Sequence, residues 1–411
     1  MSSPPPPLLP SEAPLPLSPL PADIQMDILS RVGDAVSIVR CAATCKAWRR
    51  LIKEPGFLSH LHRRRRAEGF DPSTLLGFFF RDTSKSLPRR RLYRRRPTRF
   101  LLLGDSSRPQ PSAPMVLPLS RFLTTVDDLD GFAPVASGDG GLVALCRFQC
   151  ASCHTARICV CNPLAGTSTL LPPLPSFFVP EKVVFLEVDG TSFRLLAVMD
   201  DRQGALIMRV FSSNSEDEDW DTPYAVELPD NMVVEIASPA VVHGGAVHWL
   251  CGTPALPHAL QVVAVHITET GTSVSRFSLP PRPGVHRLAT ASRAARLVSS
   301  AHGPLSFVLV DELVLSIWNL EESSKRWSCC KAVYLMPMLP LTVLSGSNVE
   351  LSIQGLCEKS GSLFFYVVGE GLFMLKLGTV KLVKVCKDHF TKYLCPYVAD
   401  FASCIRAMKS F

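Results

Sequence analysis

Residues 242–251 read Val-His-Gly-Gly-Ala-Val-His-Trp-Leu-Cys, two glycines followed at once by a short apolar run. Glycines of this kind favour a tight turn, and the run after them is rich in residue types that strands prefer. The arrangement recurs at Gly140-Gly141, Gly303 and Gly361. Gly245, Gly303 and Gly361 follow one another at 58-residue intervals. A β-unit that repeats about every 50 residues is typical of a propeller blade.

The sequence around these units indicates an all-β domain. Proline accounts for 35 of 411 residues, which leaves little room for long helices. From Leu75 onward, short runs of Val, Leu, Ile and Phe alternate with Gly, Pro, Asp and Ser. The runs expected to form strands are Gly141–Leu145, Ile158–Cys161, Val183–Val188, Phe193–Val198, Ala205–Phe211, Ala246–Cys251, Gln261–Ile267, Ser306–Val310, Leu313–Trp318, Ser362–Val368 and Gly371–Leu377.

Five repeat units can be identified between residues 132 and 390, one of them spanning Val183–Leu228. The segment Leu75–Leu119, closed by the C-terminal run Pro396–Arg406, would supply a sixth unit and leave no exposed sheet edge. We therefore predict a mainly β fold, in which a small N-terminal α domain precedes a divergent, kelch-like β-propeller of five to six blades. A pair of packed β-sheets in a sandwich is the alternative. Several units are expected to end at prolines, at Leu171-Pro172-Pro173, Leu228-Pro229 and Leu279-Pro280-Pro281.

The N-terminal region has a different pattern. Residues 1–18 form a proline-rich leader that cannot bury enough apolar surface to order itself. After it, Ile24, Ile28 and Val32 recur at helical spacing, and two further short helices are expected around Ile38 and Trp48. Three short helices bury too little surface to be safely stable alone, and their surplus of apolar residues indicates a helix-packing interface.

These residues also carry a family resemblance. The run Leu20-Pro21-Ala22-Asp23-Ile24, the pair Ile28-Leu29 and the segment Cys45-Lys46-Ala47-Trp48-Arg49 resemble the F-box in order and spacing. The Gly33–Val36 segment departs from the Leu-Pro or Asp-Pro turn that many members carry before the second helix. An ordinary helical hairpin that caps the larger domain is the alternative interpretation of the same residues.

The later region resembles the β-propeller-type associated domain that follows the F-box in many plant F-box proteins. The motifs that carry this resemblance are Leu75–Phe80, Val160–Gly166 and Val242–Leu250. Regular kelch blades would repeat a double glycine with a following Tyr and Trp. This chain has only fragments of that pattern, so we describe the predicted propeller as divergent. The expected domains are the leader at 1–18, the F-box at 19–62, a basic linker at 63–74 and the propeller at 75–411.

The resemblance implies a function. An F-box protein is the non-catalytic substrate receptor of an SCF-type cullin–RING ubiquitin ligase, which binds a Skp-family adaptor and, through it, the cullin. The propeller would then bind an unknown protein substrate. The residues expected to contact the adaptor, or to build the small core that does, are Leu20, Pro21, Ile24, Ile28, Leu29, Ile38, Cys45, Trp48 and Leu51.

A basic block offers a second hypothesis. Thirteen basic and three acidic residues lie between His60 and Phe100, while the rest of the chain is close to neutral. The Arg-rich segment 63–99 is interpreted as a solvated connector with an arginine-rich strand pair, or as a segment for nuclear import or for contact with phosphates or an acidic partner. The second interpretation would make the protein a nuclear nucleic-acid- or chromatin-associated propeller. Few aromatic residues accompany the arginines, so nucleic acid is the less favoured partner.

The remaining patterns bear on compartment and chemistry. No apolar run is long enough to cross a bilayer, and no signal peptide pattern begins the chain, so we expect reduced thiols and a location in the cytoplasm, the nucleus or both. The cysteine cluster Cys146–Cys161, with His154, is either a zinc site or a loop beside a strand whose small residues face a core. The acidic run Glu216–Asp219 is interpreted as a solvated hairpin tip rather than a calcium loop, and the scattered histidines as surface or hydrogen-bonded groups. No nucleotide-binding or hydrolase motif is present, so we expect neither a cofactor nor catalysis.

Overall fold

The computed structural model describes most of the chain. The described residues are 20–32, 38, 41–42, 46–57, 59, 73–81, 98–103, 115–121, 123, 131–147, 155–176, 178, 180–189, 192–201, 204–229, 232–234, 239–253, 256–268, 271–280, 294–299, 303–340, 349–357, 361–386 and 394–400. The chain divides into two compact units, Met1–Pro72 and Ser73–Phe411.

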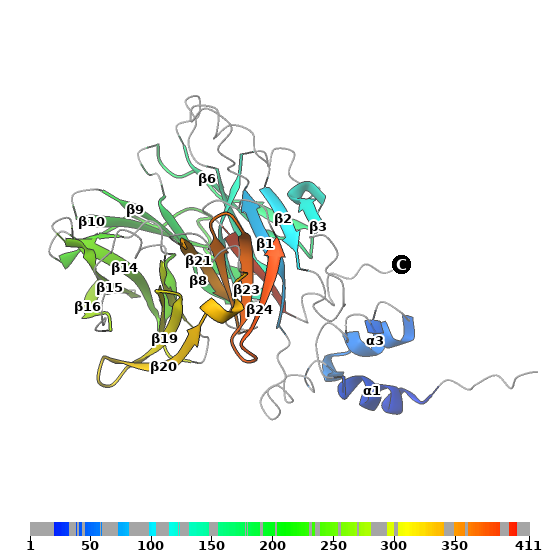
Figure 1. The fold of residues 1–411 in the computed structure, drawn as a ribbon. Coiled ribbons are helices and arrows are strands. Elements are labelled where there is room, and N and C mark those ends of the chain that lie inside the picture. The colour runs from blue at the N-terminus through cyan, green and yellow to red at the C-terminus, as the bar shows by residue number, and fades with distance from the viewer. Residues whose placement is uncertain are drawn as a thin grey trace, which may run out of the picture. The chain divides into compact units, whose positions relative to one another are not determined.

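The N-terminal unit is helical. Its two bounded helices are α1 (Ala22–Ser30) and α3 (Lys46–Lys53), which contact each other (Figure 1). Ile38, Cys41 and Ala42 are also helical and lie where the second helix was predicted. A further helical turn includes Pro55–Phe57. The expected leader at 1–18 and residues 63–72 of the expected linker at 63–74 lie outside the described residues, whereas Ser73 and Thr74 already belong to the first strand of the second unit.

The second unit is a six-bladed β-propeller, as predicted, and not a β-sandwich. Its described strands form six antiparallel sheets, one for each blade (Figure 1). Blade 1 contains β1 (Ser73–Arg81), β2 (Thr98–Leu102), β3 (Met115–Pro118) and β25 (Leu394–Asp400); blade 2 contains β4 (Ala133–Ser137), β5 (Val143–Arg147), β6 (Arg157–Asn162) and β7 (Thr167–Leu170); blade 3 contains β8 (Lys182–Asp189), β9 (Ser192–Asp200), β10 (Ala205–Ser212) and β11 (Tyr224–Glu227).

The other three blades follow in chain order. Blade 4 contains β12 (Val233–Val234), β13 (Val241–His243), β14 (Ala246–Thr253), β15 (Leu256–Thr268) and β16 (Gly271–Ser278); blade 5 contains β17 (Ala295–Val298), β18 (Ser306–Asp311), β19 (Val314–Glu321) and β20 (Arg326–Tyr334); blade 6 contains β21 (Leu351–Cys357), β22 (Ser362–Val367), β23 (Gly371–Lys376) and β24 (Lys381–Cys386). Short 3₁₀ turns include η2 (Leu119–Arg121), η3 (Asp139–Gly141) and η6 (Met336–Met338).

Both ends of the propeller domain close the ring. Strand β25 pairs with β1, with Phe79 opposite Cys395 and Phe78 opposite Pro396, so blade 1 combines three early strands with one late strand. Strand β25 also contacts β4 of blade 2 and β21 of blade 6. The prediction of closure by a C-terminal strand is confirmed, but the strand spans Leu394–Asp400. The rest of the predicted run, 401–406, lies outside the described residues.

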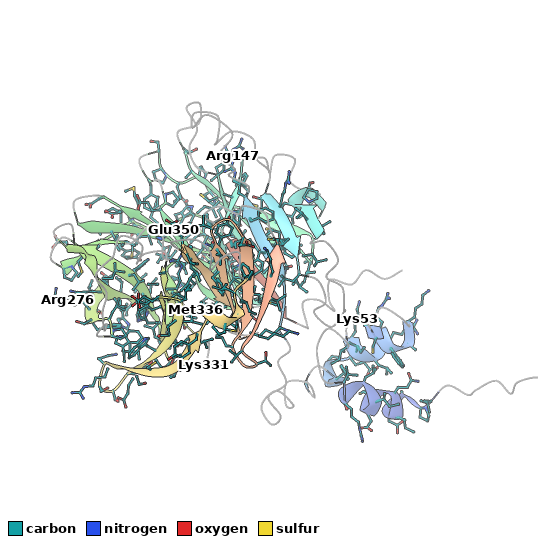
Figure 2. The ribbon with its side chains drawn as sticks, viewed as in Figure 1. Lys53, Arg147, Arg276, Lys331, Met336 and Glu350 are labelled. Atoms are coloured by element: carbon teal, nitrogen blue, oxygen red, sulfur yellow. The ribbon has the colours of Figure 1, made fainter. Side chains whose placement is uncertain are left out.

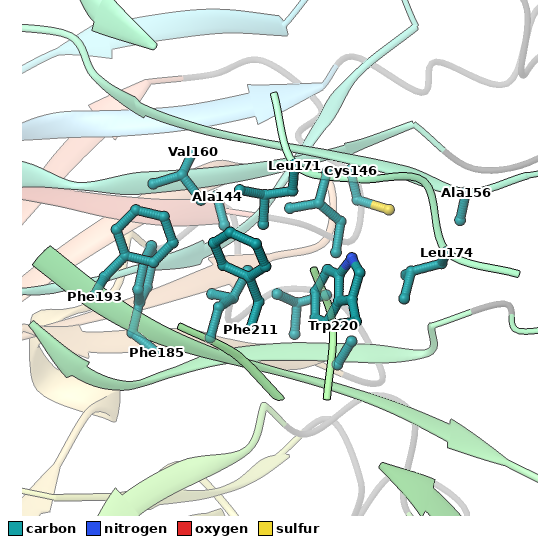
Figure 3. Packing of buried hydrophobic residues seen from close by; sticks show 14 of the residues in the cluster. Ala144, Cys146, Ala156, Val160, Leu171, Leu174, Phe185, Phe193, Phe211 and Trp220 are labelled. Carbon is teal, nitrogen blue, oxygen red and sulfur yellow. The ribbon is translucent and has the colours of Figure 1, made fainter. Parts of the chain in front are cut away.

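The hydrophobic core is divided among the gaps between neighbouring blades. One cluster joins blades 2 and 3 and includes Phe185, Phe193, Phe211 and Trp220, drawn in Figure 3. The Trp220 indole Nε1–H donates to the Pro172 carbonyl at 2.9 Å, which satisfies the polar atom of this buried ring. Equivalent clusters fill the gaps between blades 3 and 4, 4 and 5, 5 and 6, 6 and 1, and 1 and 2. Middle strands of a blade are therefore apolar on both faces, which explains the continuous runs in the sequence.

The motif Leu75–Phe80 shows this two-sided burial. Phe78 and Phe80 pack into the gap with blade 6, whereas Phe79 packs toward blade 2. Gly77 directly precedes these three residues, at a position where an added Cβ would collide with the Leu101 carbonyl oxygen and come within 2.7 Å of Phe100 Cζ. The close approach of β2 thus requires glycine at this position.

Several strand boundaries differ from the prediction. Strand β15 begins at Leu256 and not at Gln261, and β23 ends at Lys376, one residue before the predicted Leu377. Strand β5 begins at Val143 and not at Gly141, because Gly140 and Gly141 have φ values of 68° and 79° in a turn. Strand β19 begins at Val314, since Leu313 has a φ of 64°. Strand β22 ends at Val367, one residue earlier than expected. The prolines predicted to end units do follow the last strands of blades 2, 3 and 4.

Candidate functional site

The N-terminal unit carries most of the residues expected to bind a partner, and α1 presents the first of them. Pro21, at φ −50° and ψ 147°, precedes the helix, and its carbonyl accepts the first helical hydrogen bond from the Gln25 N–H at 3.0 Å. Asp23 in the first turn complements the helix dipole. At the far end, Arg31 pairs with Asp27 at 2.9 Å on the exposed side of the helix. The sequence therefore specifies a nine-residue helix with defined ends.

One side of α1 is apolar and exposed. Leu20, Ile24 and Ile28, spaced four residues apart, keep 53%, 45% and 45% of their surface accessible. Ile24 and Ile28 are four apart within α1 and therefore lie on one face of the helix, and Leu20 lies just before its N-terminal end. These three residues, which we call the α1 face, are three of nine large apolar residues exposed in the described chain. Neighbouring Pro21 is exposed as well.

Other predicted site residues lie inside the unit. Leu29, Ile38 and Leu51 are buried, together with Ile52 and Phe57. Their role in this structure is to form the small core that holds α1 in place. Trp48 is half-buried, and Cys45 lies outside the described residues. Of the nine predicted residues, the structure thus places four in an exposed group at and just before α1, Leu20, Pro21, Ile24 and Ile28, and three in a supporting core, Leu29, Ile38 and Leu51.

Arg49 has a structural role that the sequence analysis did not identify. Its guanidinium Nε–H donates to the Ala42 carbonyl at 2.9 Å, which links α3 to the helical segment before it. The F-box-like motif includes an arginine after Trp48, which was the available sequence signal for this residue. The motif does not indicate which group Arg49 binds.

The cysteine cluster in blade 2 is divided between two cores. Cys159 and Cys161 share the gap between blades 1 and 2, as alternation along the strand predicts. Cys146 lies in the gap between blades 2 and 3. Burial raises the pKa of Cys146 to about 12 and that of Cys159 to about 11, so these thiols hold their protons at neutral pH. The structure does not bring these three sulfurs together, and Cys150, Cys153 and His154 lie outside the described residues.

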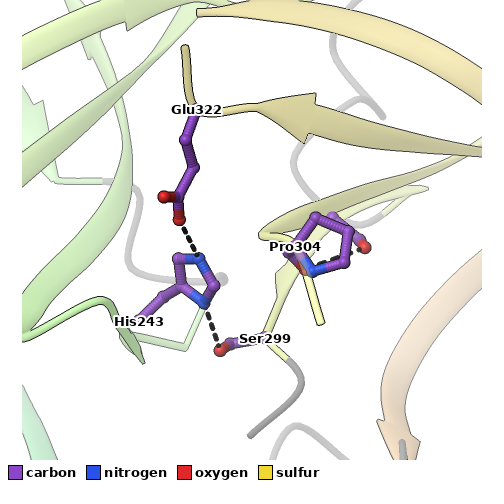
Figure 4. A network of polar contacts seen from close by, with 5 residues as sticks. His243, Ser299, Pro304 and Glu322 are labelled. Atoms are coloured by element: carbon purple, nitrogen blue, oxygen red, sulfur yellow. Dashed lines mark hydrogen bonds and ion pairs between the residues drawn. The ribbon is translucent and has the colours of Figure 1, made fainter. Parts of the chain in front are cut away.

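Polar contacts join blade 4 to blade 5. His243, at the end of β13, lies between the Ser299 hydroxyl and the Glu322 carboxylate, with both distances at 3.0 Å (Figure 4). The His243 side chain is 13% exposed and that of Glu322 is 65% exposed. The contact therefore connects two blades at the molecular surface, and it agrees with the interpretation of the histidines as hydrogen-bonded groups.

Two charged segments were also considered as sites. Glu216–Asp219 is exposed in the turn after β10, in agreement with its interpretation as a solvated tip. Of the basic block, Arg81 is buried and Arg99 is exposed on the paired strands β1 and β2. The other arginines of segment 63–99 lie outside the described residues. No helix among the described residues has the length and apolar character needed to span a membrane.

Comparison with known proteins agrees with the division into two units. Residues 17–64 match the model of the F-box-like family, and residues 109–411 match that of the domain of unknown function DUF7595. The chain belongs to the DUF7595 family. The DUF7595 region includes most of the propeller, and an F-box-like domain precedes it. No curated protein matches the sequence.

Solved structures that resemble this DUF7595 protein do so at low identity. A protein from Lactobacillus plantarum has 11% identity and a TM-score of 0.42, with 79% of this chain and 83% of that chain covered. A putative 6-phosphogluconolactonase from Bacteroides fragilis has 10% identity and a TM-score of 0.40, covering 79% and 98%. The β-propeller domain of the Trilobed protease from Pyrococcus furiosus has 12% identity and a TM-score of 0.37, covering 76% and 86%. Similarities at this low identity and TM-score do not indicate an activity for this chain.

Proposed function

We propose that this protein is the substrate-recognition subunit of an SCF-type cullin–RING ubiquitin ligase. The N-terminal unit binds a Skp-family adaptor and, through it, the cullin, and the propeller binds the protein to be ubiquitinated. The observation that carries the proposal is the exposed α1 face, Leu20, Ile24 and Ile28, in a segment that matches the F-box-like model. The cytoplasm, the nucleus or both are the compartments we propose.

The energetics of the α1 face favour a protein partner. Burying a whole Ile side chain contributes roughly 1.5–3 kcal/mol, so covering the exposed half of Ile24 or Ile28 contributes about 1 kcal/mol each. Leu20 adds a similar amount. The helix that presents these residues has nine residues and a small core behind it. A partner that covers the face would therefore stabilise the unit as well as bind it.

The proposed mechanism needs no bond chemistry from this chain. The ubiquitin-loaded enzyme of the complex carries out transfer, and the receptor holds the substrate beside it. Joining two binding modules in one chain turns transfer into an effectively intramolecular event, since the local concentration of substrate lysines rises. The contribution of this protein is therefore binding and placement.

The proposal is tested by co-expression of the full chain with a Skp-type adaptor. We expect a stable 1:1 complex, and we expect the double variant Ile24→Asp/Ile28→Asp to lose it. Losing about 2 kcal/mol of apolar burial weakens binding roughly 30-fold, and placing two carboxylates in the interface weakens it further. Leu29→Asp is unsuitable as a test, because Leu29 is 1% exposed and the change would unfold the unit.

Val368→Asp is the matched control. Val368 is 58% exposed in the turn after β22, so the variant places one carboxylate at an exposed apolar position of the propeller. It should bind the adaptor as the wild type does. Absence of a complex with the wild-type chain, or equal binding by the Ile24→Asp/Ile28→Asp variant, would overturn the adaptor assignment.

The same double variant can identify the substrate. A full chain that cannot reach the adaptor should retain proteins held by its propeller, because their ubiquitination and loss are uncoupled. We expect proteins enriched on Ile24→Asp/Ile28→Asp relative to wild type in cells with active proteasomes. Equal recovery on both chains would argue against a receptor role for the propeller.

A further inference from the structure

Two adjacent cysteines of blade 5 are more exposed to solvent than the other cysteines of the described residues. Cys329 and Cys330 are both exposed on β20, the outermost strand of the blade. Cys41 is half-buried, and the other described cysteines are buried: Cys146, Cys159, Cys161, Cys251, Cys357, Cys386 and Cys395. Soluble reagents therefore reach this pair before the thiols of the blade cores.

The strand register places the pair at a β-bulge. Trp318 of β19 lies opposite Cys329, but its neighbour Ile317 lies opposite Lys331, which leaves Cys330 as the extra residue. Trp318 packs toward blade 4 and Ile317 toward blade 6, so Cys329 and Lys331 take opposite faces of the sheet. Figure 2 labels Lys331, the residue that follows the pair. In a regular strand adjacent side chains point to opposite faces, and the bulge removes that alternation around Cys330.

The sulfur contacts show how the two thiols lie along the strand. Cys329 Sγ lies 3.7 Å from the Lys331 carbonyl oxygen, so its side chain reaches forward past the Cys330 peptide. Cys330 Sγ lies 3.3 Å from the Ile317 carbonyl oxygen across the strand. Burial and the neighbouring Cys329 sulfur raise the pKa of Cys330, which favours the thiol form of that side chain. The two sulfurs thus contact the carbonyls of Lys331 and Ile317, two residues that lie opposite each other on β20 and β19.

We propose that Cys329 and Cys330 form a vicinal dithiol site for trivalent arsenicals. A monosubstituted arsenical offers two coordination positions to sulfur. In the reaction both S–H bonds and the arsenic–oxygen bond break, two S–As bonds form, and the two protons leave with the oxygen as water. No change of oxidation state is needed. The second S–As bond closes within the chain, which makes a two-thiol site retain the ligand far better than a single thiol.

Phenylarsine oxide and the native full chain provide the test. Intact-mass measurement should show one phenylarsenic group for each chain, with the loss of one water from the sum of the reactants. Cys329→Ser and Cys330→Ser should each weaken retention at least tenfold in the presence of excess monothiol. A small-molecule dithiol should remove the group from the wild type. Serine is close to cysteine in size and polar, so an unchanged thermal transition checks that both variants are folded.

Two further variants separate this pair from other thiols. Cys150→Ser/Cys153→Ser removes a Cys-x-x-Cys pair outside the described residues, and Cys41→Ser removes a half-buried single thiol. Both should keep the tight adduct. Absence of an adduct on the wild-type chain would overturn the proposal. Retention by Cys329→Ser and Cys330→Ser equal to that of the wild type would overturn it as well. Loss of the adduct in Cys150→Ser/Cys153→Ser alone would assign the site to that pair and overturn it as well.

Discussion

His248 makes the stability of the propeller depend on pH. The residue lies on β14, is 6% exposed, and has its ring 6.0 Å from that of His243 and 6.2 Å from that of Phe277. Burial, followed by the charge of His243, lowers its pKa from 6.5 to about 4; hydrogen bonds with the Val241 and Ala246 backbone oppose this shift, and His266 adds a smaller lowering effect. The folded protein therefore keeps this imidazole neutral at pH values where an unfolded chain would protonate it.

The sign and size of the effect follow from that difference. Between pH 6.5 and pH 4 the unfolded state binds the proton more readily, so the free energy of unfolding falls as the pH falls. The contribution of His248 is fully present above pH 6.5 and is lost across this window. One pKa unit corresponds to about 1.36 kcal/mol, so acidification to pH 4.5 should destabilise the propeller by about 2.5 kcal/mol.

Urea unfolding at pH 7.0, 5.5 and 4.5 measures the effect. Tryptophan fluorescence suits the measurement, because Trp249 is fully buried beside His248 on β14. His248→Gln cannot titrate in this range, so its free energy of unfolding should fall by about 2.5 kcal/mol less than that of the wild type. Groups remote from His248 titrate equally in both proteins, so the difference between the two curves reports His248 together with its coupling to His243 and His266. Parallel curves would refute the assignment of the acid sensitivity to His248.

Two further predictions concern propeller closure and packing. Gly77→Ala should destabilise the propeller by about 3 kcal/mol or more, because its Cβ would overlap the Leu101 carbonyl, whereas Gly355→Ala, with open space around it, should change the thermal transition little. A melting curve for Gly77→Ala that matches the wild type would contradict the close contact between Gly77 of β1 and the Leu101 carbonyl of β2. Deleting residues 394–411 removes β25 and leaves β1 without its inner partner, so we expect loss of cooperative unfolding. A cooperative transition at the wild-type temperature would show that the ring closes without this strand.

Much of the fold could be predicted because blades repeat a local pattern. The middle strands of each blade are buried on both faces, so their apolar runs stand out in the sequence, as in Leu75–Phe80. Outer strands such as β7 and β16 were less visible, since many of their side chains are exposed and polar. Backbone hydrogen bonds with the neighbouring strand hold these outer strands in place, and such bonds place few requirements on residue type.

The sequence predicted where the candidate site lies, but not which of its residues are exposed for binding and which are buried in the core. Helical spacing grouped Ile24, Ile28 and Leu29 as apolar positions of one helix, and it could not say which of them a core would cover. In the structure Leu29 packs inside and the other two remain exposed. The difference decides which variants test binding and which merely unfold the unit.

The sequence by itself determined the order of the units, the strand-forming runs and the placement of Cys159 and Cys161 on one face. These properties depend on neighbours within a few residues, where backbone geometry fixes the period. Tertiary structure alone decided the pairing of β25 with β1, the bulge at Cys330 and the contact of His243 with Glu322. Each of these joins strands or blades, and the register between such segments is set by packing across the whole ring.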